Sequence, residues 1–447
     1  MFVTLTTQKL QKITTYFMRI LIKNVLLENQ KVCVLVKDNV FEKIFDIKSF
    51  VGLSNNVLTY KTDATHQTKI ILNKVIDAEN KAILPAFYNL HCHAAMTLLR
   101  GYAEDVPLFE WLQKIWQREK DLKAEDIYHG TRLAIVEMIK SGTVFFSDMY
   151  WHCEEVVRAV EEMGVRCDVG VTLMDRLSSK EIDKSFDFIK QYSKNKYERI
   201  SVSPAPHAIY TCSEKLYRQS YEIAKEYNTF LQTHLAETKT EFDDCQKSHN
   251  GLTPLQWLDS IGVMDERTIT AHCVYFTEKD AEIFSKRKSV AVHNPCSNMK
   301  LASGIFPMPL MKKYGCNVAL GTDGTSSNNN LSMIEEMKMA CLLGKVGSLN
   351  TEIVTAKEVF EMATCKGAEF YNIPSGSIKE GKLADCILID LDNERMQPLY
   401  NIIYNMVYSA DSSCVDTVIC NGKILMQNHK IENEQEIIER AKSYAKS

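Results

Sequence analysis

The feature that most constrains the fold is a long alternation of short apolar segments and helical segments between residues 85 and 343. Each apolar segment has the length of a strand, and a stretch with helical periodicity follows it. The eight predicted strands are 85–93, 143–149, 165–173, 199–204, 229–234, 268–272, 289–293 and 317–320. Strict alternation predicts parallel strands joined by helical crossovers. Eight units favour a closed (β/α)8 barrel of the TIM type over an open doubly wound sheet.

Both ends of the chain show a different pattern, in which polar turns separate short apolar runs that read as strands. These runs are 20–27, 32–36, 69–72, 82–84, 385–390, 405–408, 415–420 and 423–426. We therefore predict a small β-sandwich domain built from residues 18–84 together with 380–430, and we place the barrel in residues 85–379. Residues 1–17 are predicted to be an extension, and residues 431–447 are predicted to form a C-terminal helix.

Composition excludes several classes of partner. The formal net charge of -4, from 53 Lys and Arg against 57 Asp and Glu, gives no reason to expect nucleic-acid binding. No apolar run approaches the roughly 20 residues of a membrane span. The 14 cysteines are scattered without Cys-x-x-Cys pairs, which is typical of a reducing compartment and predicts a cytoplasmic protein. A small molecule is the expected partner, and a homo-oligomer stays open.

Residues that bind metals lie at the predicted C-terminal ends of the strands. His91 and His93 end the first strand, and their spacing of two directs both side chains to one face. His234 ends the fifth strand, His272 ends the sixth, and Asp323 follows the eighth. Active sites of such barrels lie at this face, and imidazole nitrogen with carboxylate oxygen suits Zn²⁺ or Fe²⁺. The sequence therefore predicts a metal site, which is catalytic if one position is left for water.

Two further residues extend this predicted site. Glu237 lies three residues after His234, where a carboxylate can take a proton from a metal-bound water and pass it to a leaving group. His207 follows the fourth strand in Ser203-Pro-Ala-Pro-His207, and two prolines fix that segment. We weigh a substrate contact for His207 against a structural role, and favour the contact.

The motifs around these residues resemble those of the amidohydrolase superfamily. They are His91-Cys-His93-Ala-Ala-Met-Thr-Leu-Leu-Arg-Gly, Ala103-Glu-Asp-Val-Pro-Leu-Phe-Glu-Trp-Leu112, His234-Leu-Ala-Glu237-Thr, Ala271-His-Cys-Val274, His293-Asn-Pro-Cys-Ser-Asn and Gly321-Thr-Asp-Gly-Thr. Within the superfamily they look most like the 5-methylthioadenosine/S-adenosylhomocysteine deaminases, which are related to the triazine chlorohydrolases. The match covers about residues 19–430, and it is more specific for the superfamily than for the substrate.

The resemblance implies one divalent metal per subunit, usually zinc with iron as the alternative, and four ligands: His91, His93, His234 and Asp323. It also implies that His272 orients the attacking water and that Glu237 and Asp323 relay protons. Attack at C6 of an adenine would release ammonia and leave the inosine product. Adenosine-type nucleosides are the implied substrates: 5-methylthioadenosine, S-adenosylhomocysteine, 5'-deoxyadenosine or adenosine.

The resemblance also implies three substrate contacts. Glu119 would hold the ribose hydroxyls, because a carboxylate can accept a hydrogen bond from each of them. His207 would contact the purine, and Trp111 would help to wall the pocket. For Glu119 the alternative of a solvated charge on a helix stays open.

One departure from the family concerns the 5' substituent. Family members that accept S-adenosylhomocysteine offer arginines to its carboxylate after the third strand, and an arginine fork matches a carboxylate closely. Val171 stands where the first of these arginines is expected. Arg176 and Lys180 are the candidates to replace it.

Two other functions remain as alternatives. A related hydrolase of a free purine or pyrimidine base, or of a triazine, would keep the metal site, but a free base has no ribose for Glu119. A metal-binding module without turnover is the alternative of another class. Glu237 and His272 speak against it, because a site without catalysis has no need of a proton shuttle.

Overall fold

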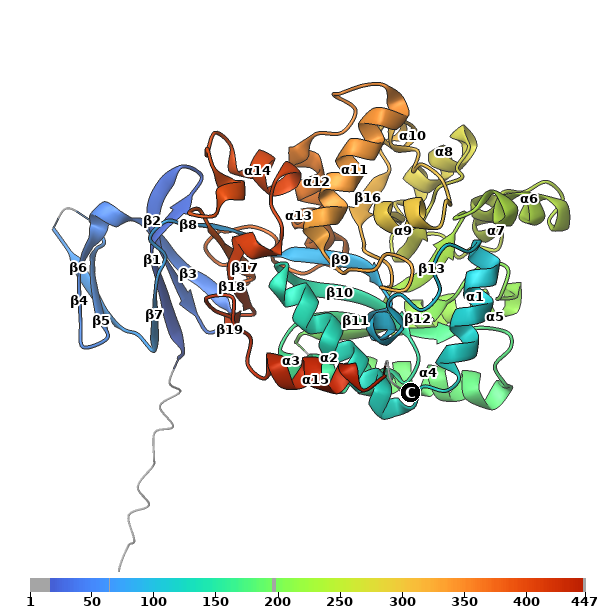
Figure 1. Ribbon diagram of the computed structural model, residues 1–447, viewed down its shortest axis with the longest axis horizontal. Coiled ribbons are helices and arrows are strands. Elements are labelled where there is room, and N and C mark those ends of the chain that lie inside the picture. Colours follow the sequence, from blue (N-terminus) through green and yellow to red (C-terminus); the bar gives the residue numbers. More distant parts are fainter. Residues whose placement is uncertain (1–16, 64, 195–197, 445–447) are drawn as a thin grey trace, which may run out of the picture.

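A ring of eight parallel strands forms the centre of the computed structural model, which describes residues 17–63, 65–194 and 198–444 (Figure 1). The strands are β9 (Phe87–Cys92), β10 (Thr143–Tyr150), β11 (Arg166–Leu173), β12 (Ile200–Pro206), β13 (Leu231–Leu235), β14 (Thr268–His272), β15 (Val290–His293) and β16 (Asn317–Leu320). They pair in two parallel sheets, in the orders β12-β11-β10-β9 and β13-β14-β15-β16. Every residue of β10 and β11 is buried, as expected for parallel strands covered by helices.

Backbone hydrogen bonds close the ring at both seams between the two sheets. At one seam the N–H of His234 on β13 donates to the carbonyl of His207, just beyond β12, at 2.9 Å. At the other the N–H of Asp323, just beyond β16, donates to the carbonyl of His91 on β9 at 3.0 Å. The predicted eight-stranded barrel is therefore confirmed.

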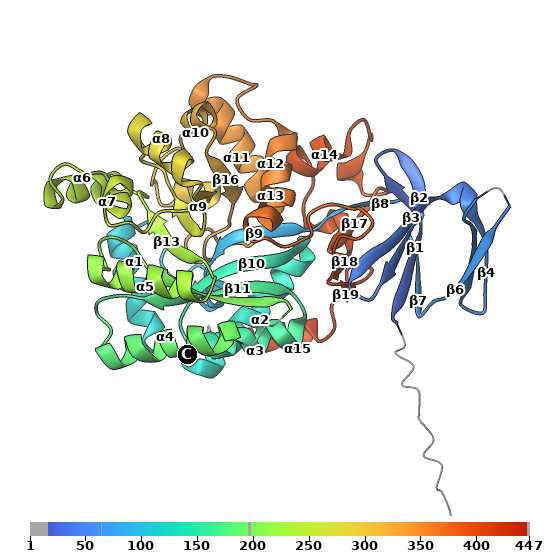
Figure 2. The ribbon, with the colours of Figure 1, turned by 180° about the vertical axis from the view of Figure 1, so that it is seen from behind.

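The helices of the middle part of the chain surround this ring (Figures 1 and 2). They are α1 (Leu108–Glu119), α2 (Ala124–Lys140), α3 (Cys153–Met163), α4 (Ser179–Lys194), α5 (Glu214–Glu226), α6 (Lys239–Ser248), α7 (Pro254–Ser260), α8 (Glu278–Arg287), α9 (Pro295–Lys300), α10 (Met308–Tyr314), α11 (Met333–Ser348), α12 (Ala356–Ala363) and α13 (Cys365–Phe370). Two of these helices, α1 and α2, lie between β9 and β10. Four of these helices were not predicted: α6, α9, α12 and α13.

Strands from the two chain ends pair in one further sheet. Its strands are β1 (Arg19–Leu27), β2 (Gln30–Lys37), β3 (Val40–Asp46), β7 (Lys74–Asp77), β8 (Lys81–Pro85), β17 (Cys386–Asp390), β18 (Val415–Cys420) and β19 (Lys423–Met426). The antiparallel pairing of β8 with β17 joins the N-terminal part to the C-terminal part. Figure 2 shows this sheet beside the barrel. Residues 1–16 of the predicted extension lie outside the described residues.

A small antiparallel sheet packs next to this larger one. It consists of β4 (Phe50–Ser54), β5 (Val57–Lys61) and β6 (Gln67–Ile71). Leu58 and Tyr60 of β5 form one buried cluster with Leu21 of β1 and Leu35 of β2. The contact is apolar, so burial of these side chains drives the packing of the two layers.

The strand predicted at 405–408 is wrong, because this segment lies in the helix α14 (Ile402–Tyr408). Asn401 caps the helix, since its side chain accepts from the N–H groups of Ile403 and Tyr404. The side chains of Met406 and Val407 are buried in the core. A short apolar run fits a buried strand and a buried helix equally well, and here the cap decides.

The last helix, α15 (Glu434–Lys442), lies within the range predicted for a C-terminal helix and packs on the barrel (Figure 1). Its Glu434 pairs with Lys140 of α2 at 2.7 Å, and its Glu436 pairs with Arg132 of α2 at 3.0 Å. Among the helices of the described residues, none has the length and apolar character that crossing a membrane requires.

A buried ion pair joins the barrel to the sheet of the chain ends. Nε of Arg166, at the start of β11, lies 3.0 Å from Oδ2 of Asp385, just before β17. Asp385 also accepts from the hydroxyl of Tyr88 at 3.1 Å and from the N–H of Asn421 at 2.6 Å. Both charged groups are almost fully buried, so each depends on the other for its stability in the interior.

Replacing Arg166 by methionine is expected to lower the free energy of unfolding by about 3–5 kcal/mol, because it leaves the Asp385 charge buried without its partner. Urea denaturation of the two proteins measures the difference. Arg218→Met is the matched control, since Arg218 forms an ion pair with Glu214 on the surface of α5. A change for Arg166→Met as small as that for the control would contradict the role given to the buried pair.

Candidate active site

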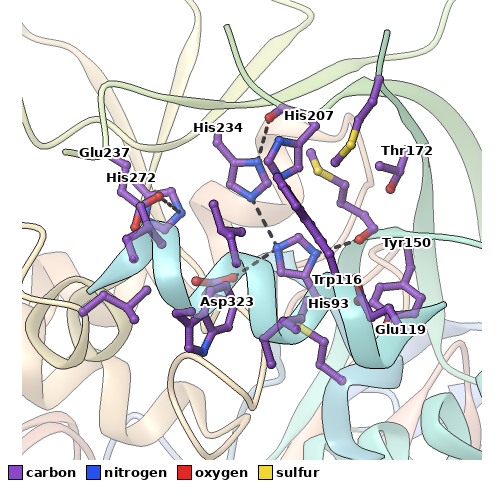
Figure 3. Close-up of a pocket in the computed structure, with 18 of the residues that line it drawn as sticks. His93, Trp116, Glu119, Tyr150, Thr172, His207, His234, Glu237, His272 and Asp323 are labelled. Carbon is purple, nitrogen blue, oxygen red and sulfur yellow. Dashed lines mark hydrogen bonds and ion pairs between the residues drawn. The ribbon is translucent and has the colours of Figure 1, made fainter. Parts of the chain in front are cut away.

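The predicted metal ligands and the proton acceptor meet at the C-terminal ends of the barrel strands. His91 lies on β9 and His93 directly follows it, while His234 lies on β13. Asp323 follows β16, and Glu237 follows β13. All five side chains are buried, and Figure 3 shows His93, His234 and Asp323 turned toward one another.

The atoms at the centre of this cluster have the spacing of ligands around one ion. Oδ1 of Asp323 lies 3.2 Å from Nε2 of His93 and 3.5 Å from Nε2 of His91. Nε2 of His93 lies 3.3 Å from Nε2 of His234. Ligands bound at about 2.1 Å to a tetrahedral ion lie roughly 3.4 Å apart. Nε2 of His91 is buried without a hydrogen-bond partner among the described residues, which fits the chemistry of a metal ligand.

The atoms of the predicted ligands that face away from the cluster form hydrogen bonds with the rest of the protein. Nδ1 of His93 donates to the carbonyl of Met149, and Nδ1 of His234 donates to the carbonyl of His207, each at 2.7 Å. These bonds place the ring proton on Nδ1, so the lone pair of Nε2 is available to coordinate a metal. Oδ2 of Asp323 accepts from the hydroxyls of Ser297 at 2.6 Å and Ser327 at 2.8 Å. The cluster is a site for a divalent metal.

Burial and ion pairing shift the pKa values of the predicted ligands in opposite directions. Burial lowers the pKa of His91 to about 4, so its imidazole is neutral near pH 7. Burial also disfavours the charged form of His93, but the Asp323 carboxylate outweighs it and raises the pKa to about 9. The favourable interactions with His91 and His93 outweigh the burial of Asp323 and hold its pKa well below the usual range. A metal that enters this site displaces a proton.

His272 ends β14 and lies beside the cluster. Its Nδ1 donates to Oδ1 of Asn298 at 2.8 Å, and its Nε2 lies 3.8 Å from Oε2 of Glu237. His272, Cys273 and Asp323 adopt left-handed backbone conformations, with φ of 74°, 49° and 62°. Residues with a side chain adopt this region only where the surroundings impose it, and such strain gathers at functional sites. Nε2 of His272 is close enough to His91 and Asp323 to join a metal site, so geometry alone leaves it two roles.

Glu237, the predicted proton acceptor, lies in the interior beside Ser303. Its carboxyl group is buried, and its Oε1 accepts from the hydroxyl of Ser303 at 3.0 Å. Burial raises the pKa of Glu237, and the nearby His272 reduces this effect. A carboxyl group whose pKa is raised can take up and release a proton closer to neutral pH.

Residues of the cluster line a pocket, and the same pocket contains the three predicted substrate contacts. Trp111 and Glu119 come from α1, and His207 comes from the segment after β12. Burial lowers the pKa of His207 to about 3, so the ring is neutral. The indole N–H of Trp111 donates to the carbonyl of Ser326 at 3.2 Å, which fixes this wall of the pocket.

Glu119 is not a solvated helix charge. Its Oε1 is buried and has no hydrogen-bond partner among the described residues, and burial raises its pKa. A buried acceptor without a partner is costly for the free protein, and a hydroxyl group of a ligand would satisfy it. Figure 3 shows Glu119 on the side of the pocket that carries His93 and Tyr150.

Sequence reasoning missed two hydroxyl groups in this part of the pocket. Tyr150 ends β10 and Thr172 lies near the end of β11, and both hydroxyls are buried, that of Tyr150 beside the Glu119 carboxyl group. Both lie at the strand ends where a barrel carries its site, so the same rule that found the histidines could have found them.

A wider chamber opens from the pocket beyond Glu119, with a volume of about 990 Å³. Val171 and Arg176 line it, whereas Lys180 is not among its lining residues. The Arg176 guanidinium lies over the rings of Trp116 and Trp151, at 5.0 and 5.5 Å from their centres. Of the two cations considered as replacements for an arginine at position 171, the structure brings only Arg176 to the chamber.

The chain is similar to known proteins over most of its length. Residues 82–425 match the model of the amidohydrolase family. The chain belongs to the amidohydrolase family. It is 42% identical over 420 residues to a 5'-deoxyadenosine deaminase from Methanosphaera stadtmanae, covering 92% of this amidohydrolase and 94% of the relative. It is 45% identical over 384 residues to 5-methylthioadenosine/S-adenosylhomocysteine deaminase 1 from Archaeoglobus fulgidus, covering 83% and 89%.

A solved structure extends the agreement to the whole fold of this amidohydrolase. The crystal structure of an adenosine deaminase from Xanthomonas campestris with bound zinc superposes with a TM-score of 0.86 at 26% identity. The match covers 96% of this chain and 98% of that chain. The family resemblance inferred from the motifs is thereby confirmed.

Replacing Ser297 by alanine is expected to weaken divalent-metal binding by this amidohydrolase about 10- to 100-fold, because Asp323 loses one of the two hydroxyls that hold its Oδ2. Competition with a chelator measures the affinity. Ser220→Ala is the matched control, since Ser220 is buried in α5 and its hydroxyl has no hydrogen-bond partner among the described residues. Equal affinities of the two variants would contradict this role for Ser297.

Proposed function

We propose that this amidohydrolase is a metal-dependent deaminase of adenosine-type nucleosides, which releases ammonia and leaves the inosine product. The observation that carries the proposal is the buried, unpartnered Oε1 of Glu119 in the pocket above the metal cluster. A hydroxyl-bearing sugar satisfies that oxygen, whereas a free base or a triazine offers no ribose to it. The names of the relatives support the same class of substrate.

We infer that the metal is zinc, one ion per subunit, held by His91, His93, His234 and Asp323. Three imidazole nitrogens and one carboxylate oxygen are a suitable donor set for zinc, and the zinc in the Xanthomonas campestris structure supports this choice. When bound, the metal supplies Lewis-acid activation of the attacking water. Iron(II) accepts the same donors, and metal analysis of the purified protein separates the two.

Glu237 and His272 handle the proton of the attacking water in this proposal. Glu237 takes one proton of the water as the water oxygen adds to C6, and delivers it to N1, where the C6–N1 double bond opens. The second proton of the water passes to the 6-amino group, which leaves as ammonia while the C6 carbonyl forms. Nδ1 of His272 is held by Asn298, so its Nε2 stays on the side of Glu237 and orients the water. Oδ1 of Asp323, beside His93, is the second acceptor in this relay.

The substrate lies between α1 and the strand ends in this proposal. Glu119 accepts hydrogen bonds from both ribose hydroxyls, and the hydroxyls of Tyr150 and Thr172 lie in the same region. The neutral ring of His207 faces the purine, and Trp111 provides an apolar wall. The nucleoside then fills the space between the metal cluster and the wider chamber.

The wider chamber receives the 5' substituent. Val171 offers no charge there, so the neutral groups of 5-methylthioadenosine and 5'-deoxyadenosine fit this wall without an unpaired charge. The carboxylate of S-adenosylhomocysteine needs a cation, and Arg176 meets this need from the chamber wall.

We also propose a division of the chain and a location. The apolar cluster shared by the two sheets of the chain ends supports one β-sandwich domain of residues 18–84 and 380–430, next to a barrel of residues 85–379. Helix α15 supports the C-terminal helix of residues 431–447. All 14 cysteines lie in the described part of the chain and are free, which supports a reducing compartment such as the cytoplasm.

The test is the loss of adenine absorbance together with ammonia release by zinc-loaded protein. We expect turnover of 5-methylthioadenosine, 5'-deoxyadenosine and adenosine, and none of guanine or cytosine. Glu237→Gln is expected to lower kcat about 10²- to 10⁴-fold, because the amide cannot accept the proton. Glu222→Gln, an exposed position on α5, is the matched control. Turnover of a free base without turnover of the nucleosides would refute the proposal.

Arg176→Met is expected to lower kcat/KM for S-adenosylhomocysteine about 10- to 100-fold, because a charge-assisted hydrogen bond to the carboxylate is lost. For 5'-deoxyadenosine, kcat/KM of the same variant should stay close to that of the unmodified protein. Lys180→Met is the matched control, since Lys180 is an exposed cation that does not line the chamber. Equal losses for both substrates would contradict a contact with the carboxylate.

A further inference from the structure

A second glutamate lies behind the proposed proton acceptor. Glu241 belongs to the first turn of α6, yet its side chain is almost fully buried. Its Oε1 accepts from the N–H of Ala236 at 2.9 Å, and its Oε2 accepts from the N–H of Glu237 at 2.8 Å. One carboxylate therefore holds two consecutive peptide groups, which include that of Glu237 itself.

This arrangement differs from an ordinary helix cap. Thr238 is the N-cap of α6, and its hydroxyl accepts from the N–H of Glu241 at 3.2 Å. In a capping box the glutamate at this position would reach back to the N–H of the N-cap residue. Here the carboxylate extends past Thr238 to the two residues before it. The side chain thus stabilises the segment between β13 and α6 rather than only the end of the helix.

The segment held by Glu241 is strained and clamped from both sides. Ala236 adopts a left-handed conformation with φ of 51°, which is unfavourable for a residue with a Cβ atom. Its carbonyl accepts from the N–H groups of Val274 and Tyr275, both at 3.0 Å. The N–H of Ala236 is bound to Glu241, and its carbonyl is bound to the segment after β14. These bonds fix the orientation of the Ala236 backbone. That orientation sets the direction in which the next side chain, that of Glu237, leaves the chain.

We propose that Glu241 is a positioning residue that holds the Glu237 carboxylate against Ser303 and His272. This inference rests on the proposed function, in which Glu237 transfers the proton. Glu241 is not among the residues that line the substrate pocket, so its effect on the reaction passes through the backbone of Glu237. A positioning role of this kind changes kcat more than substrate binding, because the displaced group acts in the chemical step.

Glu241→Gln is the variant that tests this role. The carboxylate accepts at two oxygens, whereas glutamine has one carbonyl oxygen and an NH₂ group that cannot accept. One of the two N–H groups would lose its partner and the other would lose a charge-assisted bond. In full-length, zinc-loaded protein we expect kcat to fall about 10- to 100-fold, as for a displacement of about 1 Å, while KM and the zinc content stay close to those of the unmodified protein.

Asp244→Asn is the matched control, because Asp244 is an exposed carboxylate on the same helix. It is expected to leave kcat unchanged. Glu241→Asp gives a second measurement if Glu241→Gln fails to fold, since its shorter carboxylate reaches fewer of the two N–H groups and predicts the same loss in kcat. Unchanged kcat in a folded Glu241 variant, or a rise in KM that accounts for the whole loss, would overturn the inference.

A crystallographic comparison separates this inference from the proposed function. In crystals of the Glu241 variant, Glu237 should move away from the hydroxyl of Ser303, which it meets at 3.0 Å in the unmodified chain. If the unmodified protein deaminates no nucleoside, the proposed function fails, and the position of Glu237 still decides the structural part of this inference. A Glu237 carboxylate that keeps its place in the variant refutes it in either case.

Discussion

The three histidines and the aspartate of the proposed metal site lie together in the interior at the end of the barrel, and the protein around them has to offset their desolvation. A buried charge is stable only when it is paired and hydrogen-bonded. Nδ1 of His93 and Nδ1 of His234 each donate to a backbone carbonyl, and Oδ2 of Asp323 accepts from two serine hydroxyls. The remaining nitrogen and oxygen atoms face one another, as the donor atoms of a metal site would.

The closure of the barrel and the assembly of this cluster depend on the same backbone groups. The peptide of His234 bonds to the carbonyl of His207 at one seam, and the peptide of Asp323 bonds to the carbonyl of His91 at the other. Three of these four residues are metal ligands in the proposed site, and His207 faces the substrate. Because the seams fix the strands relative to one another, they also fix the distances between ligands from opposite halves of the ring.

Much of the barrel could be predicted because its strands are buried on both faces and its helices follow in regular alternation. The prediction failed where local signals were short: the run at 405–408 became a helix through the cap of Asn401, and α6 was not recognised. The pattern Thr238-x-x-Glu241 was a sequence signal for α6, but its carboxylate binds outside the helix. Only three-dimensional contacts reveal that use.

The sequence by itself determined which chemistry this protein has available. Histidines and carboxylates in fixed motifs placed the proposed ligands and the proposed proton acceptor at strand ends, because strand periodicity is local and the barrel repeats the same unit. Tertiary structure decided which polar groups are deprived of water. Glu119 lies at the end of an amphipathic helix, where sequence allows a solvated charge, but the strand ends opposite bury its oxygen. Burial and distance depend on residues far apart in the chain, so they follow only from the folded protein.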